Sequence, residues 1–242
     1  MWTFYRQNLT HEVIGDGCAL LFCLPCQTKA IRAIAKRNSI KVLIVGLTCS
    51  SQQHFGATQY LFKRERIHAN EVRGIKYRGD GWPGGVKISL ASGETRLVPN
   101  LGSTWTEIFH SKLFCPKRCF QCSDTLNKLA DISLADPWLP EYIQGETIGK
   151  TLVMLNTCEG ESFVQSCKQD GYVTLEAFPY DKVLASQQFT IDRKSRYCRN
   201  RRWVMRFAWL MSNCIYRAVV LNTCFGYGVH SRLKAAMERR LS

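Results

Sequence analysis

The sequence predicts an α/β protein with a mixed sheet that combines a βαβ unit, an antiparallel meander and a cysteine-bearing loop. Two short apolar runs, at residues 18–24 and 41–46, flank an amphipathic stretch, which is typical of buried parallel strands joined by a helix. Between residues 72 and 98, alternating apolar and polar segments separated by turn residues indicate an antiparallel meander. Residues 99–130 are expected to form a long connection without regular structure, and this connection carries closely spaced cysteines.

Each element has a local reason in the sequence. The first apolar run is followed by Pro25, Cys26 and Gln27 and then by an amphipathic stretch that carries Ala30, Ile31 and Ile34. A second helical pattern follows Cys49 and includes apolar residues up to Leu61. After the long connection, we expect a strand at 131–134, a strand at 152–155, a helix at 161–168 and a strand at 172–175.

The charge divides the chain into an α/β domain at residues 1–190 and a basic helical extension at residues 191–242. The extension has twelve Lys or Arg and two acidic residues, so it holds most of the net charge of +14. A basic stretch of this kind can bind nucleic acid, an anionic membrane or an acidic partner, or it can dock on the protein's own core. No recognised nucleic-acid-binding module accompanies the charge, which disfavours nucleic acid as a partner.

The composition also constrains the compartment. No apolar run approaches the 18 residues that a membrane-spanning helix needs, so we expect no membrane span. The N-terminus lacks a signal-peptide pattern, and the chain has twelve cysteines. Cysteines in a protein without a secretory signal hold metal more often than they form disulfides, so we expect a cytoplasmic, metal-binding protein.

The cysteine spacings allow three interpretations, two of which come from local motifs. The C-x4-C-x2-C spacing of plant-type ferredoxins occurs at Cys18, Cys23 and Cys26. Two of these cysteines fall in an apolar strand, where side chains point to alternating faces, which argues against a shared cluster. The C-x3-C-x2-C spacing of radical-SAM enzymes occurs at Cys115, Cys119 and Cys122. That motif normally precedes a barrel, and only 120 residues follow it here.

The third interpretation is a four-thiolate site. Cys26 and Cys49 each follow a predicted parallel strand, and functional groups gather at the carboxyl edge of such strands. Both are also expected near a helix N-terminus, whose partial positive charge favours a thiolate. Cys119 and Cys122 form a chelating pair that completes the set. Four thiolates suit either a [4Fe-4S] cluster or zinc.

Five segments in order give the chain a resemblance to a known family. They are Leu24–Gln27, Gly46–Cys49, Tyr77–Gly85, Cys119–Cys122 and Ala130–Glu141. Together they resemble the C-terminal domain of the coenzyme F-420 hydrogenase/dehydrogenase beta subunit family, and the likeness runs from about residue 18 to 200.

The resemblance implies an iron-sulfur flavoprotein that passes electrons between a [4Fe-4S] cluster, FAD and a hydride-carrying substrate such as coenzyme F-420. Carried over residue by residue, the family's cluster ligands fall on Cys26, Cys49, Cys119 and Cys122. The family's usual N-terminal part has no counterpart in this sequence. We therefore expect a truncated or split member whose FAD site is incomplete.

A glycine-rich loop supplies the candidate cofactor-binding residues, which are Arg78, Gly79, Asp80, Gly81, Trp82, Gly84 and Gly85. Such a sequence is most often a hairpin turn. In the functional interpretation, the glycines let backbone N–H groups approach a phosphate or a ring, Trp82 stacks on an isoalloxazine, and Arg78 pairs with an anion.

The function expected from these observations is an oxidoreductase, or a subunit of one, that transfers electrons to a redox partner protein or to a small-molecule hydride acceptor. No residue is assigned a catalytic role. The alternative is a non-catalytic interaction or electron-relay subunit in which an iron-sulfur cluster or zinc stabilises the fold.

Overall fold

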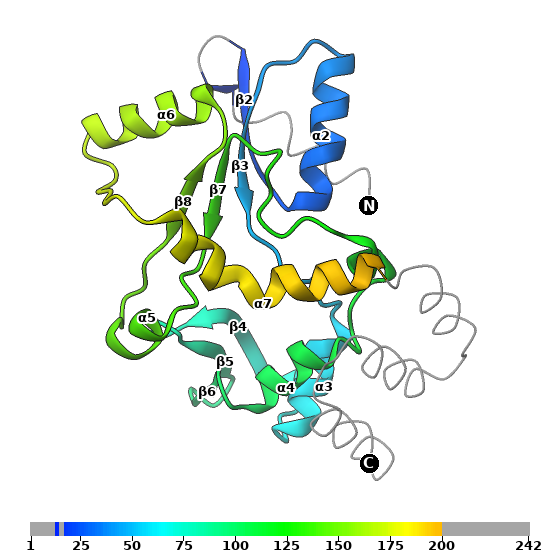
Figure 1. Cartoon of the computed structure of the whole chain (residues 1–242). Coiled ribbons are helices and arrows are strands. Elements are labelled where there is room, and N and C mark those ends of the chain that lie inside the picture. The colour runs from blue at the N-terminus through cyan, green and yellow to red at the C-terminus, as the bar shows by residue number, and fades with distance from the viewer. Residues whose placement is uncertain (1–12, 15–16, 200–242) are drawn as a thin grey trace. The chain divides into compact units, whose positions relative to one another are not determined.

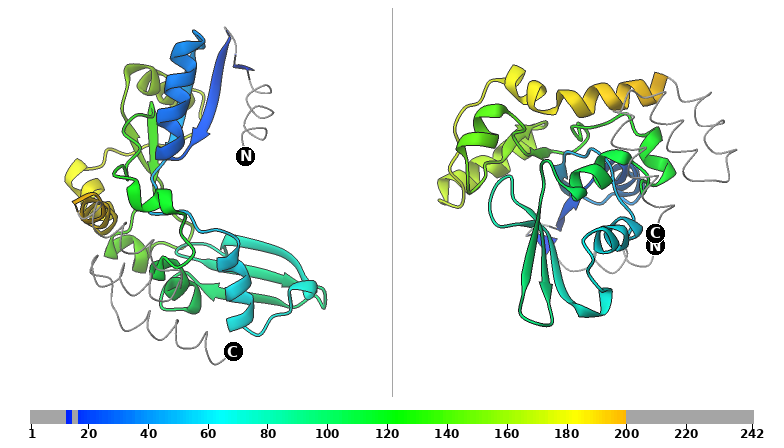
Figure 2. Two further views of the ribbon diagram at one scale, coloured as in Figure 1. Left: turned by 90° about the vertical axis from the view of Figure 1, so that its right-hand side faces the viewer. Right: turned by 90° about the horizontal axis from the view of Figure 1, so that it is seen from below.

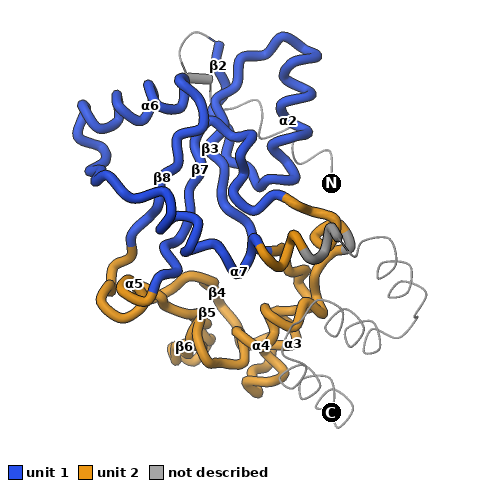
Figure 3. The backbone as a smooth tube through the Cα atoms, in the orientation of Figure 1, with its two compact units in different colours: residues 1–50, 124–139, 150–191 blue, residues 51–123, 140–149, 192–242 orange. Residues whose placement is uncertain are grey.

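The structure is a computed structural model that describes residues 13–14 and 17–199 (Figure 1). The predicted basic extension lies largely at residues 200–242, outside the described residues. The chain divides into two compact units, each built from separate segments (Figure 3). Unit 1 comprises residues 1–50, 124–139 and 150–191, and unit 2 comprises residues 51–123, 140–149 and 192–242.

Unit 1 contains a five-stranded mixed sheet in the order β1-β2-β3-β7-β8. The central strands β2, β3 and β7 are parallel, whereas the edge strands β1 and β8 run antiparallel to their neighbours. Helix α2 (Pro25–Arg37) connects β2 to β3, which confirms the predicted βαβ unit. The strands are β1 (Val13–Ile14), β2 (Cys18–Cys23), β3 (Val42–Leu47), β7 (Ile132–Ala135) and β8 (Leu152–Leu155).

The apolar run of β3 is continuous because both faces of the sheet are covered. Successive side chains of a strand point to opposite faces. Ile44 packs with Ile31 of α2 on one face. The next residue, Val45, packs with Val164 of helix α6 (Cys158–Gln169) on the other face. The two helices therefore bury opposite sides of one parallel sheet, the arrangement that such apolar strands predict.

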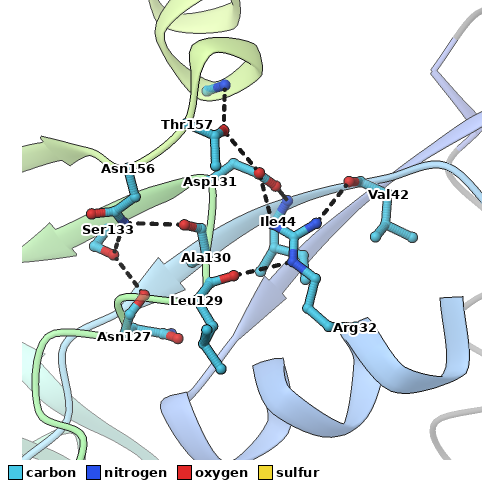
Figure 4. A network of polar contacts seen from close by, with 11 residues as sticks. Arg32, Val42, Ile44, Asn127, Leu129, Ala130, Asp131, Ser133, Asn156 and Thr157 are labelled. Carbon is cyan, nitrogen blue, oxygen red and sulfur yellow. Dashed lines mark hydrogen bonds and ion pairs between the residues drawn. The ribbon is translucent and has the colours of Figure 1, made fainter. Parts of the chain in front are cut away.

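A buried carboxylate joins these layers (Figure 4). Asp131 is 4 % exposed, and its Oδ2 accepts the backbone N–H of Ile44 at 2.7 Å. Its Oδ1 lies 2.7 Å from Nη2 of Arg32 on α2 and accepts the Thr157 hydroxyl at 2.9 Å. The same hydroxyl caps α6 by accepting the N–H of Gly160. One side chain thus ties α2, β3 and the start of α6 together.

Unit 2 contains the predicted antiparallel meander, formed by β4 (Val72–Gly79), β5 (Gly85–Leu90) and β6 (Thr95–Pro99) (Figure 2). Helix α3 (Gly56–Arg64) packs on it through the fully buried Leu61, which shares a core with Val86, Ile88 and Ile108. The shorter elements of this unit are the 3-10 turns η1 (Ala69–Glu71) and η2 (Lys117–Gln121) and helix α5 (Pro140–Gly145).

Two expectations for regular structure are wrong. The connection at 99–130 contains helix α4 (Thr104–Ser111), which begins because the Ser103 hydroxyl accepts the N–H groups of Trp105 and Thr106. Residues 172–175 form no strand, and Tyr172 is 79 % exposed. They lead instead to helix α7 (Tyr180–Arg199), whose residues belong first to unit 1 and then to unit 2.

No helix in the described part of the chain is long and apolar enough to cross a membrane.

The Asp131 network makes a prediction about stability. Asp131→Ala leaves the Arg32 guanidinium, the Ile44 N–H and the Thr157 hydroxyl without their shared acceptor, and we expect a loss of about 3 kcal/mol in the free energy of unfolding. Urea unfolding followed by circular dichroism measures the change. As a control in the same unit, Glu176→Ala removes an exposed carboxylate and should change stability by less than about 0.5 kcal/mol. Equal stabilities of the two variants would contradict the role given to Asp131.

Candidate functional site

Cys26 lies at the carboxyl edge of the parallel strands of unit 1. It is the second residue of α2, and only Leu24 separates this helix from the end of β2. The turn before it is fixed by the side-chain oxygen of Gln27, which accepts the N–H of Leu24 at 2.8 Å. The side chain of Cys26 is a partly exposed thiol in the first turn of the helix. Its predicted position near a helix N-terminus is therefore confirmed.

Cys49 lies at the same edge, just beyond β3. Its N–H donates to the carbonyl of Thr125 at 2.9 Å, and the preceding residue, Thr48, donates to Leu134 of β7 at 2.8 Å. The Thr48 bond continues the β3–β7 ladder past the last residue of β3, whereas Thr125 lies in the connection before β7. The expectation that Cys49 also lies near a helix N-terminus is wrong, because α3 begins only at Gly56.

Asn127 holds the two strand ends at this edge. Its Nδ2 donates to the carbonyl of Cys23 at 2.9 Å and to that of Leu47 at 3.5 Å, which are the last residues of β2 and β3. The amide approaches so closely that a Cβ on Gly46 would lie 2.4 Å from it. Gly46 therefore lacks a side chain for a packing reason. Asn127 was not among the residues predicted for the site.

A buried hydroxyl two residues before Asn127 lacks a hydrogen-bond partner among the described residues. Thr125, whose carbonyl binds the Cys49 N–H, is 4 % exposed, and its Oγ1 has no hydrogen-bond partner among the residues that the structure describes. Buried hydroxyl groups are normally hydrogen-bonded, so an orphaned donor calls for an acceptor. A sulfur of a cluster held by Cys49 fits that requirement.

In unit 2, three sulfur atoms of the 115–122 loop accept N–H groups. The backbone N–H of Gln52 donates to Cys119 Sγ at 3.4 Å, and Nζ of Lys194 donates to Cys122 Sγ at 3.4 Å. The side-chain amide of Gln53 donates to Cys115 Sγ at 3.3 Å. Sulfur is a weak hydrogen-bond acceptor as a thiol and a stronger one as a metal-bound thiolate, so these donors are compatible with sulfur ligands.

The four predicted cluster ligands are divided between the units. Cys26 and Cys49 belong to unit 1, and Cys119 and Cys122 belong to unit 2. Within either unit, no three His, Cys, Asp or Glu side chains of the described residues are grouped closely enough to hold one metal ion. The assignment of the four ligands therefore stays a prediction.

Cys23 has the properties of a core residue. It is 3 % exposed and packs with Ile44 and Ala130. Burial raises the pKa of its thiol to about 11, with the Arg32 guanidinium acting in the opposite direction. At neutral pH the sulfur is protonated, so it is a poor metal ligand. This agrees with leaving Cys23 out of the predicted ligand set.

The glycines of the 79–85 loop are used by the protein's own backbone. A Cβ on Gly81 would lie 2.4 Å from the Thr147 carbonyl, and one on Gly84 would lie 2.5 Å from the carbonyls of Gly79 and Gly81. A Cβ on Gly85 would lie 2.4 Å from the Val98 carbonyl. These contacts, and the positive φ angles of Gly81 and Gly84, explain the glycines without a bound phosphate.

Trp82 is anchored to the segment that contains α5. Its indole N–H donates to the Tyr142 carbonyl at 2.9 Å, and its backbone N–H donates to the Thr147 carbonyl at 2.7 Å. The Arg78 guanidinium lies over the ring, 5.8 Å from the centroid. Asp80 forms an ion pair with Lys87 at 2.7 Å. The predicted loop residues are thus brought together, and Arg78, Asp80 and Gly81 are exposed.

Residues 19–180 match the family described as the C terminus of the beta subunit of coenzyme F-420 hydrogenase/dehydrogenase. The chain belongs to this family. The match covers more than half of the sequence and confirms the resemblance that the five motifs indicated. No curated protein matches the sequence of this family member.

A solved structure shares the fold. It is a chain from the xenon-derivatised F-420-reducing [NiFe] hydrogenase complex of Methanosarcina barkeri, with a TM-score of 0.50 and 18 % sequence identity. The similarity covers 80 % of the present chain and 62 % of that chain. The present family member therefore spans less than two thirds of the length of that relative. The mixed sheet, the meander and the cysteine-bearing loop agree with the predicted fold class.

The environment of Cys23 predicts its reactivity. Because the thiolate is the nucleophile and the pKa of Cys23 is about 11, iodoacetamide at pH 8 should alkylate the exposed Cys158 and leave Cys23 unmodified in the folded protein. Peptide mass spectrometry reports both sites. In urea, both should react. Alkylation of the two cysteines at equal rates under folding conditions would contradict the raised pKa and the burial.

Proposed function

We propose that this chain is an iron-sulfur flavoprotein oxidoreductase, or the electron-transferring subunit of one. Its [4Fe-4S] cluster would be held by Cys26, Cys49, Cys119 and Cys122. The cluster supplies one-electron transfer and the flavin supplies hydride chemistry. The chain's own residues would hold the sulfurs in place, and N–H groups of Gln52 and Lys194 donate to Cys119 and Cys122.

The observation that carries the proposal is family membership combined with the chemistry of the predicted ligands. All four cysteines are thiols rather than disulfide partners. Cys119 and Cys122 each accept an N–H group, and the Thr125 hydroxyl beside the Cys49 backbone is a buried donor with no acceptor among the described residues. Donors around anionic sulfur are what a thiolate-ligated cluster requires.

The proposed flavin contact is the exposed side of the loop that contains Arg78, Asp80 and Gly81, next to the Trp82 ring. The support comes from the cation beside an aromatic ring, since the glycines are explained by packing. FAD is the proposed flavin, and a coenzyme F-420-type deazaflavin is the proposed hydride-carrying substrate. The fold relative belongs to a hydrogenase complex, which supports a redox partner subunit for this chain.

Metal analysis tests the proposal directly. Anaerobically purified protein should contain about four iron and four acid-labile sulfide per chain. Serine at Cys26, Cys49, Cys119 or Cys122 should lose or destabilise the cluster, because a hydroxyl replaces a thiolate ligand. Serine at Cys158 or Cys167, which serve as matched controls, should leave the iron content unchanged.

Two results would contradict this ligand set. Stoichiometric zinc without labile sulfide would end the electron-transfer proposal and favour the non-catalytic subunit in which a metal stabilises the fold. If Cys115→Ser lost iron while Cys26→Ser kept it, the C-x3-C-x2-C spacing would be the better guide to the ligands.

A second prediction separates ring stacking from loop structure. If Trp82 stacks on the flavin, Trp82→Ala should weaken flavin or coenzyme F-420 binding about three- to tenfold, for a contact worth roughly 0.5–1.5 kcal/mol. Trp82→Phe keeps an aromatic face but loses the N–H bond to Tyr142, so its affinity should remain close to that of the parent. Iron content should stay intact in both. Fluorescence titration decides, and equal affinities of all three proteins would leave the loop a structural turn.

A further inference from the structure

Lys194 is a buried lysine directed at a sulfur atom. It lies in α7 and is 2 % exposed, and its Nζ is 3.4 Å from Sγ of Cys122. Both residues belong to unit 2. Lysine is almost never fully buried unless its ammonium group is paired. Cys122 Sγ is one of the partners of this ammonium group.

The strength of the contact between Lys194 and Cys122 depends on what the sulfur carries. Removing an ammonium group from water costs free energy, which a strong acceptor or an opposite charge must offset. A neutral thiol is a weak acceptor and offsets little of this cost. A thiolate, or a thiolate bound to an anionic cluster, offsets much more. A cluster bound at Cys122 would therefore strengthen the contact that Lys194 Nζ makes with this sulfur at 3.4 Å.

Cys119 provides an internal comparison. Its Sγ accepts a backbone N–H from Gln52, which has no formal charge. Cys122 accepts from a side chain that brings a positive charge as well as a donor. Hydrogen bonds to cluster sulfurs and nearby charge are among the factors that set a cluster's reduction potential. Of these two contacts, only the one from Lys194 adds charge.

We propose that Lys194 is a positioning residue that raises the reduction potential of the cluster through its N–H···S bond to Cys122. The inference rests on the proposed function, because it requires a cluster at Cys122. Reduction adds one electron to an already anionic centre, so a nearby cation and donor stabilise the reduced form more than the oxidised form. Removing them lowers the potential.

The test is a dithionite titration of the full-length, anaerobically purified protein, with the reduced cluster followed by electron paramagnetic resonance. Lys194→Met should change the ratio of reduced to oxidised cluster at least about tenfold at a fixed potential, which is a decrease of about 59 mV or more. Lys194→Gln keeps a donor without the charge and should give a smaller decrease. Lys194→Arg keeps both, and its potential should stay close to that of the parent.

A matched control is Lys76→Met, which removes an exposed lysine of β4 in the same unit and should leave the potential unchanged. Iron content is measured for every variant. A Lys194→Met protein with full iron and the parental potential overturns the proposal, as does an equal shift in Lys76→Met. If Lys194→Met does not retain its cluster, the potential of Lys194→Gln decides, and a parental value overturns the proposal.

If the proposed function itself is wrong, the iron and sulfide content of the parent protein will show it. Parent protein that holds no iron and sulfide overturns the proposed function and, with it, the role of Lys194. Parent protein that holds the cluster while the Lys194 variants keep its potential overturns only the role of Lys194.

Discussion

The layers of unit 1 are joined by one buried carboxylate, that of Asp131, and both of its oxygens have partners. An ionised carboxyl group removed from water is stable only when cations and hydrogen-bond donors surround it. Asp131 meets that condition with partners from three elements: the Arg32 side chain on α2, the Ile44 backbone in β3 and the Thr157 hydroxyl before α6. Helices α2 and α6, which cover opposite faces of the sheet, are thereby both linked through Asp131 to β3. The carboxyl edge that carries Cys26 and Cys49 is built on this arrangement.

Much of the fold could be predicted because its strands differ in environment. A strand covered on both faces is continuously apolar, as β3 is, whereas burial alternates along β5 and β6 of the meander. Alternation alone did not suffice at residues 172–175, where Tyr172 points into solvent. Helix α4 was hidden in a cysteine-rich connection, although the cap at Ser103 and Thr106 was a usable local signal.

The site was less predictable, because its supports are tertiary. The chain order and the apolar strands place Cys26 and Cys49 at one edge, and both could be identified from sequence. Asn127 binds a carbonyl 104 residues away, and Lys194 lies 72 residues from its sulfur partner, so no local pattern indicates either contact. For the glycines of the 79–85 loop, a local sequence pattern was present, but its functional interpretation differs from the contacts that the glycines make. Their pattern suggests a phosphate cradle, whereas their contacts show close backbone packing.

The donors to the two sulfurs of the C-x2-C pair differ in how they can change during evolution. Cys119 accepts from a main-chain amide at Gln52, which every residue type except proline would supply. Cys122 accepts from the side chain of Lys194 in α7, so this contact depends on the codon for that one residue. A change at that codon alters the surroundings of one sulfur and leaves the cysteines themselves untouched. The donor to one sulfur of the pair can therefore change by substitution in α7 while both cysteines stay the same.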